Sequence, residues 1–186
     1  MRESKADNIY DLKNKVVVIT GSCGQLGSSM CGLFINIGCK VIGIDYLIES
    51  NKINNVDYYQ LDIRKSKDVS TVFKSIFDKF KKIDVLINNA GVSVFETFED
   101  RSEENFEWVM NVNLKGTFNC IQKYVANYDL KGQKQGCIIN IASMYGVISP
   151  DFRIYSENDR KNSEIYGATK AGVIQMSKYF AVHLAE

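Results

Sequence analysis

The stretch VVVITGSCGQLG, at residues 16–27, decides the fold of this chain. Its first five residues are mostly β-branched and apolar, which is typical of a buried parallel strand. The glycines that follow, Gly21, Gly24 and Gly27, suit a loop that turns tightly, brings its backbone close to a ligand and packs against the next helix. Strand, glycine loop and helix in this order predict a nucleotide site, although an ordinary strand-to-helix turn is the alternative.

Two features beyond the loop indicate how a nucleotide would be held. The helix predicted over about 25–37 offers its first N–H groups, those of Gln25 and Leu26, to phosphates. A second strand, predicted over 40–45, ends in Asp45, about twenty residues beyond the glycines, where a carboxylate can accept both ribose hydroxyls. Because this carboxylate would repel a 2′-phosphate, the sequence favours NAD over NADP. The alternative is that Asp45 only caps the next segment.

Strands and helices alternate along the rest of the chain. This alternation predicts an α/β fold, a doubly wound parallel sheet with helices on both faces and the strand order 3-2-1-4-5. We expect further strands over 57–62, 84–88 and 137–142, and further helices over about 66–80, 102–127 and 164–185.

Tyr166 and Lys170 form the strongest chemical motif. Residues at i and i+4 share a helix face. An ammonium held beside a phenol favours the phenolate, which suits the phenol to proton transfer in hydride chemistry at a carbonyl. On its own this spacing is a weak signal, since an amphipathic tyrosine beside a solvated lysine looks the same.

Five further segments carry motifs: YYQLDI at 58–63, DVLINNAG at 84–91, VMNVNLKGTF at 109–118, CIINIAS at 137–143 and YGATK at 166–170. With the glycine loop they make the chain resemble the short-chain dehydrogenases/reductases, single-domain branch, from about Leu12 to the last residue. Several independent motifs in the right order make this resemblance specific.

The resemblance implies a single NAD-binding Rossmann domain over 1–186 that interconverts a secondary alcohol and a ketone on a small-molecule substrate. NADP is the less expected cofactor. The implied catalytic residues are Asn113, Ser143, Tyr166 and Lys170. The implied cofactor-binding residues, besides the glycine loop with Gln25 and Leu26 and besides Asp45, are Asp62, Ile63, Asn89, Ala90, Gly91, Tyr166 and Lys170.

Simple chemistry leaves alternatives for several of these side chains. Ser143 follows a buried strand and could hydrogen-bond a substrate carbonyl, or it could only cap the next turn. Asn113 could hold a water in a proton relay or brace the backbone near Lys170. Asn88 and Asn89 suit hydrogen bonds that join strand ends, with only the neighbouring backbone touching cofactor.

The chain departs from the family in its glycine spacing and in the interval between Ser143 and Tyr166. The spacing Gly-x-x-Gly-x-x-Gly is more typical of the extended branch. The interval is longer than usual, and Tyr155 stands at the usual distance from Ser143. Asp159, rather than lysine, follows Tyr155 by four residues, so we reject Tyr155 as the catalytic phenol.

The extra segment over 151–163 resembles a subgroup linked to flagellin modification and nonulosonic-acid sugars. It suggests a polar substrate such as a sugar phosphate or nucleotide sugar; the alternative is a surface loop without a ligand.

The family normally continues beyond Glu186 with two strands, a turn that clasps the nicotinamide and a helical lid. We therefore expect a sheet that ends after the fifth strand and its following helix, with an exposed edge. A fragment, an interrupted reading frame and a natural short form all remain open. The alternative function is a catalytically incompetent nucleotide-binding or regulatory protein, and we expect the chain as given to bind nucleotide with little dehydrogenase activity.

The composition fits one domain and gives no sign of a nucleic-acid or membrane partner. The chain is 45% hydrophobic and 24% charged with a net charge of +1, and no apolar run is long enough for a bilayer. This gives no case for nucleic acid or membrane as a partner. The polar N-terminus lacks the apolar region of a signal peptide, so we expect a cytoplasmic protein.

The cysteines and the single histidine argue against a metal centre. The five cysteines form no metal-like pairs, and we interpret them as reduced core residues. His183 is the only histidine, which leaves no multi-histidine site. The helices predicted over 102–127 and 164–185 are apolar over wide faces, and since these helices form the dimer face in the family, we expect a homodimer or homotetramer.

Overall fold

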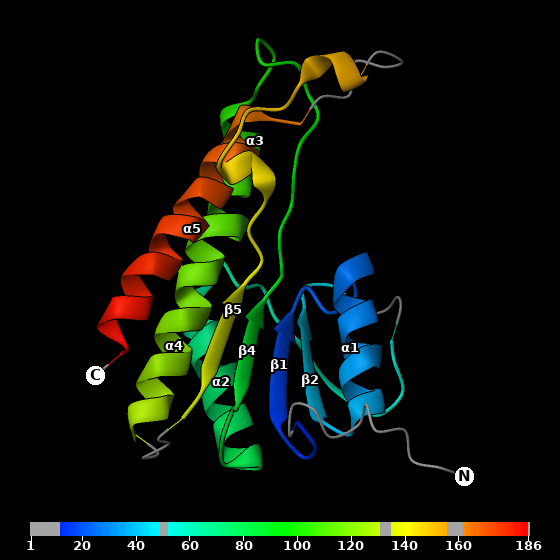
Figure 1. Ribbon diagram of the computed structural model, residues 1–186, viewed down its shortest axis with the longest axis vertical. Coiled ribbons are helices and arrows are strands. Elements are labelled where there is room, and N and C mark those ends of the chain that lie inside the picture. The colour runs from blue at the N-terminus through cyan, green and yellow to red at the C-terminus, as the bar shows by residue number, and fades with distance from the viewer. Residues whose placement is uncertain (1–11, 49–51, 131–134, 156–161, 186) are drawn as a thin grey trace.

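The computed structural model describes residues 12–48, 52–130, 135–155 and 162–185. These residues form a parallel five-stranded sheet in the order β3-β2-β1-β4-β5 (Figure 1). The strands are β1 (Val16–Thr20), β2 (Lys40–Asp45), β3 (Val56–Gln60), β4 (Val85–Asn88) and β5 (Cys137–Asn140). The predicted α/β class and strand order are confirmed.

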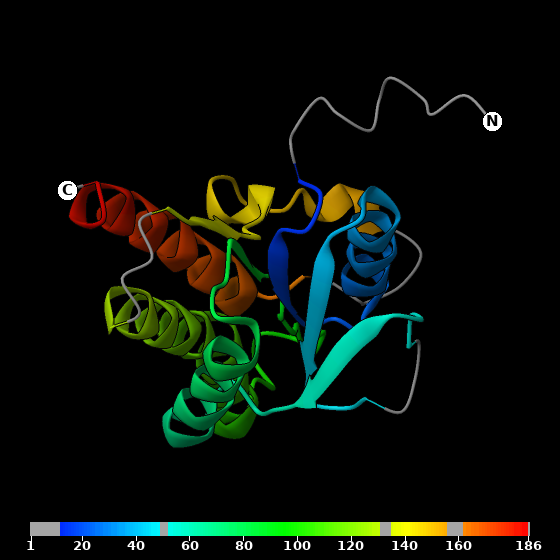
Figure 2. The same ribbon diagram turned by 90° about the horizontal axis from the view of Figure 1, so that it is seen from below.

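Helices cover both faces of the sheet. Figure 2 shows α1 on one side and α2, α4 and α5 on the other. The α-helices are α1 (Gln25–Ile37), α2 (Ser66–Phe80), α3 (Glu103–Met110), α4 (Thr117–Leu130) and α5 (Glu164–His183). The shorter elements are a π-helix, η2 (Asn111–Gly116), and two 3₁₀ helices, η3 (Met144–Gly146) and η4 (Phe152–Tyr155).

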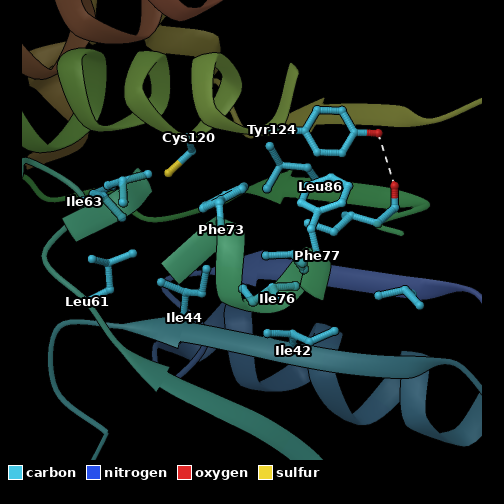
Figure 3. Close-up of a cluster of buried hydrophobic side chains, with 14 residues drawn as sticks. Ile42, Ile44, Leu61, Ile63, Phe73, Ile76, Phe77, Leu86, Cys120 and Tyr124 are labelled. Carbon is cyan, nitrogen blue, oxygen red and sulfur yellow. Dashed lines mark hydrogen bonds between the residues drawn. The ribbon is translucent and has the colours of Figure 1, made fainter. Parts of the chain in front are cut away.

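Two hydrophobic cores form because successive residues of β1 face opposite sides of the sheet. Val17 and Ile19 pack with buried residues under α1, including Cys31. Val16 and Val18 pack on the other side, under α2 and α4. Figure 3 shows this second core, in which the hydroxyl of Tyr124 donates a hydrogen bond to the backbone oxygen of Ile83 at 3.2 Å and the labelled apolar side chains are Ile42, Ile44, Leu61, Ile63, Phe73, Ile76, Phe77 and Leu86.

The helix expected over 102–127 is interrupted by a π turn. Helix α3 ends at Met110, η2 follows, and α4 begins at Thr117. A Cβ on Gly116 would lie 2.6 Å from the Cδ1 atom of Ile63, so this turn approaches the end of β3 closely. Single π turns inside α-helices are frequent at functional sites.

Two strands are shorter than expected. Strand β3 ends at Gln60 rather than at residue 62, and β5 ends at Asn140 rather than at residue 142. Among the described strands, β5 pairs with β4 alone, and Ile139 on it is 42% exposed. In the segment over 151–163, residues 156–161 lie outside the described residues.

The cysteines are free thiols, and four of them are buried. Cys137 is exposed at the start of β5, so the expectation of a core position is wrong for this residue. It lies at the edge of the sheet, where no described element covers it. None of the helices in the described ranges combines the length and the apolar character needed to cross a membrane.

Candidate active site

The described residues surround a cavity of about 1090 Å³ at the carboxyl ends of the strands. Ligands bind at this edge in open α/β sheets. Figure 1 shows the segments after β4 and β5 extending beyond this edge, beside α3 and the start of α5. The predicted site residues that line the cavity are Gly21, Gly24, Gln25, Leu26, Asp45, Asp62, Ile63, Asn89, Ala90, Gly91, Ser143, Tyr166 and Lys170.

Gly27 and Asn113 are buried and do not line the cavity. Gly27 is the tightest position of the glycine loop, since a Cβ there would lie 2.0 Å from the backbone oxygen of Gly21. Gly21 itself has φ +66°, a left-handed conformation that favours glycine. The loop therefore keeps its shape only with glycine at these two positions, and it presents exposed backbone at Gly24 to the cavity.

Two carboxylates lie at the nucleotide end of the cavity. Asp45 accepts hydrogen bonds from the backbone N–H of Cys23 at 2.9 Å and of Leu47 at 3.2 Å. These bonds join the end of β2 to the glycine loop. The Asp62 carboxylate is paired with Arg64, with Nε and Nη2 at 2.8–3.1 Å from its oxygens, and this hydrogen bonding lowers the pKa of Asp62. Arg64 also lines the cavity and was not expected there from the sequence.

Helix α5 brings Tyr166 and Lys170 into the cavity. Ser163 caps this helix by accepting a hydrogen bond from the backbone N–H of Tyr166. The Nζ atom of Lys170 lies 5.6 Å from the centroid of the Tyr166 ring and donates a hydrogen bond to the backbone oxygen of Ile141 at 2.7 Å. Lys170 is buried, which lowers its pKa. The predicted pair is thus assembled, with the ammonium held between α5 and the end of β5.

Asn113 lies in the π turn and braces backbone rather than facing the cavity. Its Oδ1 atom accepts from the N–H of Val92 at 2.8 Å, and its Nδ2 atom donates to the oxygen of Val92 at 2.9 Å and to the hydroxyl of Thr169 at 3.1 Å. These contacts tie the segment after β4 to helix α5 one residue before Lys170. The sequence leaves two roles open for Asn113, a proton relay through a water and a brace for the backbone near Lys170. The hydrogen bonds to Val92 and Thr169 are contacts of the second kind.

Ser143 makes the capping contact that the sequence offered as its alternative role, and Asn88 and Asn89 join strand ends as expected. The hydroxyl of Ser143 lines the cavity and accepts a hydrogen bond from the backbone N–H of Tyr145 at 3.2 Å. Asn88 donates to Asn140 at 2.8 Å, which joins β4 to β5. Asn89 donates to the backbone oxygens of Thr20 and Gly21 and so fixes the start of the glycine loop.

Several cavity residues were missed by sequence reasoning. Tyr145, Tyr155, Ser93 and Asn162 contribute polar groups, and Phe95, Trp108 and Val112 contribute apolar surface. The hydroxyls of Tyr145 and Tyr155 are 3.1 Å apart. Tyr155 and Asn162 belong to the extra segment over 151–163, for which the sequence leaves open a substrate contact or a surface loop without a ligand, but no individual residue of this segment is predicted for the site.

Arg101 links the loop after β4 to the start of α5. Its side chain is 7% exposed, and its guanidinium contacts Glu96 at 2.8 Å and Glu164 at 3.1 Å. Glu96 also accepts a hydrogen bond from Asn105. Since Glu164 precedes Tyr166 by two residues, this ion-pair network holds the first turn of α5 against the loop that carries Ser93 and Phe95.

Replacing Arg101 with glutamine should lower the free energy of unfolding by about 1–3 kcal/mol, because two carboxylates lose a charged partner. The matched control is Arg153→Gln, whose guanidinium pairs with Asp151 at 2.7 Å while 90% exposed and should contribute little. Denaturant unfolding of both variants measures the difference. Equal stability of the two variants would contradict a role for the Arg101 network.

Comparison with known proteins places this geometry in a family. The model of the family described as short chain dehydrogenase matches residues 15–186. A 3-oxoacyl-acyl-carrier-protein reductase, FabG, of Thermotoga maritima is 35% identical over 183 residues, which cover 94% of this chain and 70% of the reductase. An NAD-dependent glycerol dehydrogenase of Listeria innocua is 29% identical, with coverage of 96% of this chain and 68% of that protein.

A solved structure has a similar fold. The crystal structure of a short chain dehydrogenase from Leptospira borgpetersenii with bound NAD+ aligns with a TM-score of 0.87 and 37% identity, covering 100% of this chain and 70% of that chain. This chain therefore combines a family match over nearly its whole length with the glycine loop, the sheet order and the pair formed by Tyr166 and Lys170. This chain belongs to the short-chain dehydrogenase family of oxidoreductases.

Proposed function

We propose that residues 1–186 act as one NAD-binding domain that interconverts a secondary alcohol and a ketone. The observation that carries this proposal is the meeting of Ser143, Tyr166 and Lys170 in the same cavity as the glycine loop. Neither the loop nor the pair on α5 would be decisive alone. Together they place a nucleotide-binding loop and a proton-transfer group in one cavity.

The residues present fit NAD. The backbone is close-packed at Gly21 and Gly27, and the start of α1 lines the cavity, where its first N–H groups would meet a pyrophosphate. Asp45 would hold the adenosine ribose, while Asp62 and Ile63 lie where the adenine would rest. The bound NAD+ in the Leptospira structure supports the same cofactor here.

Each catalytic side chain has a role that its position supports. NAD, when bound, supplies the hydride acceptor. Tyr166 takes the proton from the substrate oxygen during oxidation and returns it during reduction. Lys170 favours the phenolate form of Tyr166 and binds the nicotinamide ribose. Ser143 donates a hydrogen bond to the substrate oxygen, and Asn113 is a positioning residue that holds the Val92 backbone and Thr169.

The substrate class that the site supports is a hydroxylated compound of the sugar or polyol type. Polar side chains from the interval between Ser143 and Tyr166 reach the cavity, as the longer interval suggested. The glycerol dehydrogenase relative supports a polyol, whereas the FabG relative would support an acyl thioester. An oxidation assay that follows NADH formation on polyols, sugars and a 3-hydroxyacyl thioester tests the choice; turnover of the thioester alone would contradict it.

We also propose a homodimer or homotetramer in the cytoplasm. On the helices expected to form the interface, Phe106 and Phe118 are 44% and 40% exposed, whereas Val109, Ile121 and Val173 belong to the core. Aromatic side chains on an exposed face suit a subunit contact. Free, mostly buried thiols fit a reducing compartment. Sedimentation of the parent and of a Phe118→Glu variant would test the subunit contact.

Replacing Asp45 with asparagine should weaken NADH binding and lower the preference for NADH over NADPH roughly tenfold or more, because repulsion of the 2′-phosphate is lost. Asp57→Asn is the matched control, since this exposed carboxylate on β3 pairs with Lys79 outside the cavity. Titration of both nucleotides by fluorescence measures the ratio. A parent protein that already prefers NADPH would show that Asp45 does not select the cofactor.

A further inference from the structure

The cavity has two chemically different ends. The nucleotide end carries the ion pair of Asp62 and Arg64 together with Asp45. Beyond Ser143 and Tyr166 the polar lining residues are uncharged: Ser93, Tyr145, Tyr155 and Asn162. Lys170 also lines the cavity, and its ammonium donates a hydrogen bond to the backbone oxygen of Ile141.

Tyr145 has a fixed position relative to the reacting groups. It stands two residues after Ser143 in η3, and the backbone of η3 packs directly on α5. A Cβ on Gly167 would lie 2.8 Å from the backbone oxygen of Tyr145, and a Cβ on Gly146 would lie 2.8 Å from the backbone nitrogen of Ala171. Glycine at both positions therefore lets η3 lie against the helix that carries Tyr166.

Tyr155 reaches the same place from η4. Its hydroxyl lies 3.1 Å from that of Tyr145, and this hydrogen bond raises the pKa of Tyr155. A phenol can donate one hydrogen bond and accept two, so the pair keeps both a donor and acceptor sites after its mutual bond.

Two further polar side chains of this end are also held by hydrogen bonds. The Oδ1 atom of Asn162 accepts hydrogen bonds from the hydroxyl of Ser93 at 3.0 Å and from the backbone N–H of Ser163 at 3.1 Å. With its oxygen used in this way, the amide of Asn162 offers N–H donors to further partners. The second end therefore offers both donors and acceptors, beside the apolar surface of Phe95 and Trp108.

We infer that Tyr145 and Tyr155 form a hydroxyl-reading pair, and that the substrate is an uncharged polyhydroxylated compound with a hydroxyl next to the carbon that is oxidised. This inference rests on the proposed function and narrows its substrate class. A substrate that lacks the second hydroxyl would cover the pair without giving its remaining donor and acceptor sites a partner, which a hydrogen-bonding site disfavours. A phosphate or carboxylate would meet no cationic partner among the described residues at this end.

The test compares cis-cyclohexane-1,2-diol with cyclohexanol, which differ by one hydroxyl. Calorimetry on the protein saturated with NADH measures binding of each alcohol in a complex that cannot react. The parent should bind the diol more tightly, and Tyr155→Phe and Tyr145→Phe should each weaken diol binding about three- to tenfold, with a smaller effect on cyclohexanol. Tyr179→Phe, 61% exposed on α5, should change neither affinity.

The outcomes separate this inference from the proposed function. Equal affinity for the two alcohols, an unchanged ratio in both phenylalanine variants, or tighter binding of cyclohexyl phosphate would overturn the hydroxyl-reading pair, even if NADH forms from cyclohexanol. Selective diol binding that depends on the two phenols, without any NADH formation from NAD+ and the diol, would support the pair and contradict the oxidoreductase proposal. Unfolding curves of both variants confirm that each remains folded.

Discussion

Replacing Tyr166 with phenylalanine should lower kcat by about 10²–10⁴ and leave NADH affinity nearly unchanged. The change removes only the hydroxyl that exchanges a proton with the substrate oxygen. The ring, its contact with the Lys170 ammonium and the cap from Ser163 to the Tyr166 N–H all remain. Steady-state rates of NADH formation, with NADH binding measured in parallel by fluorescence, separate the chemical step from cofactor binding.

The control for this variant is Tyr179→Phe. Tyr179 lies on the same helix but is 61% exposed and does not line the cavity. Its loss should leave kcat within about twofold, as is usual for exposed positions away from a site. If Tyr166→Phe turned over as fast as this control, Tyr166 would not be the proton-transfer group.

Replacing Gly27 with alanine should weaken nucleotide binding about ten- to a hundredfold and destabilise the protein by about 1–3 kcal/mol. The added methyl group would lie 2.0 Å from the backbone oxygen of Gly21, and backbone on both sides must move to admit it. The phosphate loop then loses the shape that places its N–H groups. Calorimetric titration with NAD and denaturant unfolding measure the two effects.

Gly32→Ala is the matched control, because it lies in the same helix and a Cβ there meets nothing within 4 Å. Alanine in a helix interior is favoured over glycine by roughly 1 kcal/mol, so this variant should be as stable as the parent or more stable. A Gly27→Ala protein with unchanged NAD affinity would show that the loop tolerates a side chain there and that its close packing is not needed for binding.

The elements with strong local signals were predicted well from the sequence. Strands β1 and β2 and helices α1 and α2 have the expected bounds, because a β-branched run before a glycine loop and a regular apolar period each specify structure locally. The Tyr166 and Lys170 pair was also predictable, since helical spacing alone brings the two side chains together.

The rest depends on contacts between distant segments. The π turn at η2 coincides with the hydrogen bonds of Asn113 to Val92 and Thr169 and with the close approach of Gly116 to Ile63, none of which a local pattern contains. The meeting of Tyr145 and Tyr155 requires two separate 3₁₀ turns to fold toward each other. Sequence spacing could exclude Tyr155 as the partner of a lysine, but it could not place its hydroxyl in the cavity wall.

The π turn also sets a rotational register between two parts of one long helical segment. Each residue added to or removed from an α-helix rotates everything after it by roughly 100°. Within the turn, Asn113 must face Thr169, and downstream, Cys120 and Tyr124 must face the sheet. The widened turn accommodates an extra residue between these two directions, so a one-residue deletion within Asn111–Gly116 would let the segment close into a regular α-helix with α4 still facing the sheet, but would remove the position from which Asn113 reaches Val92 and Thr169.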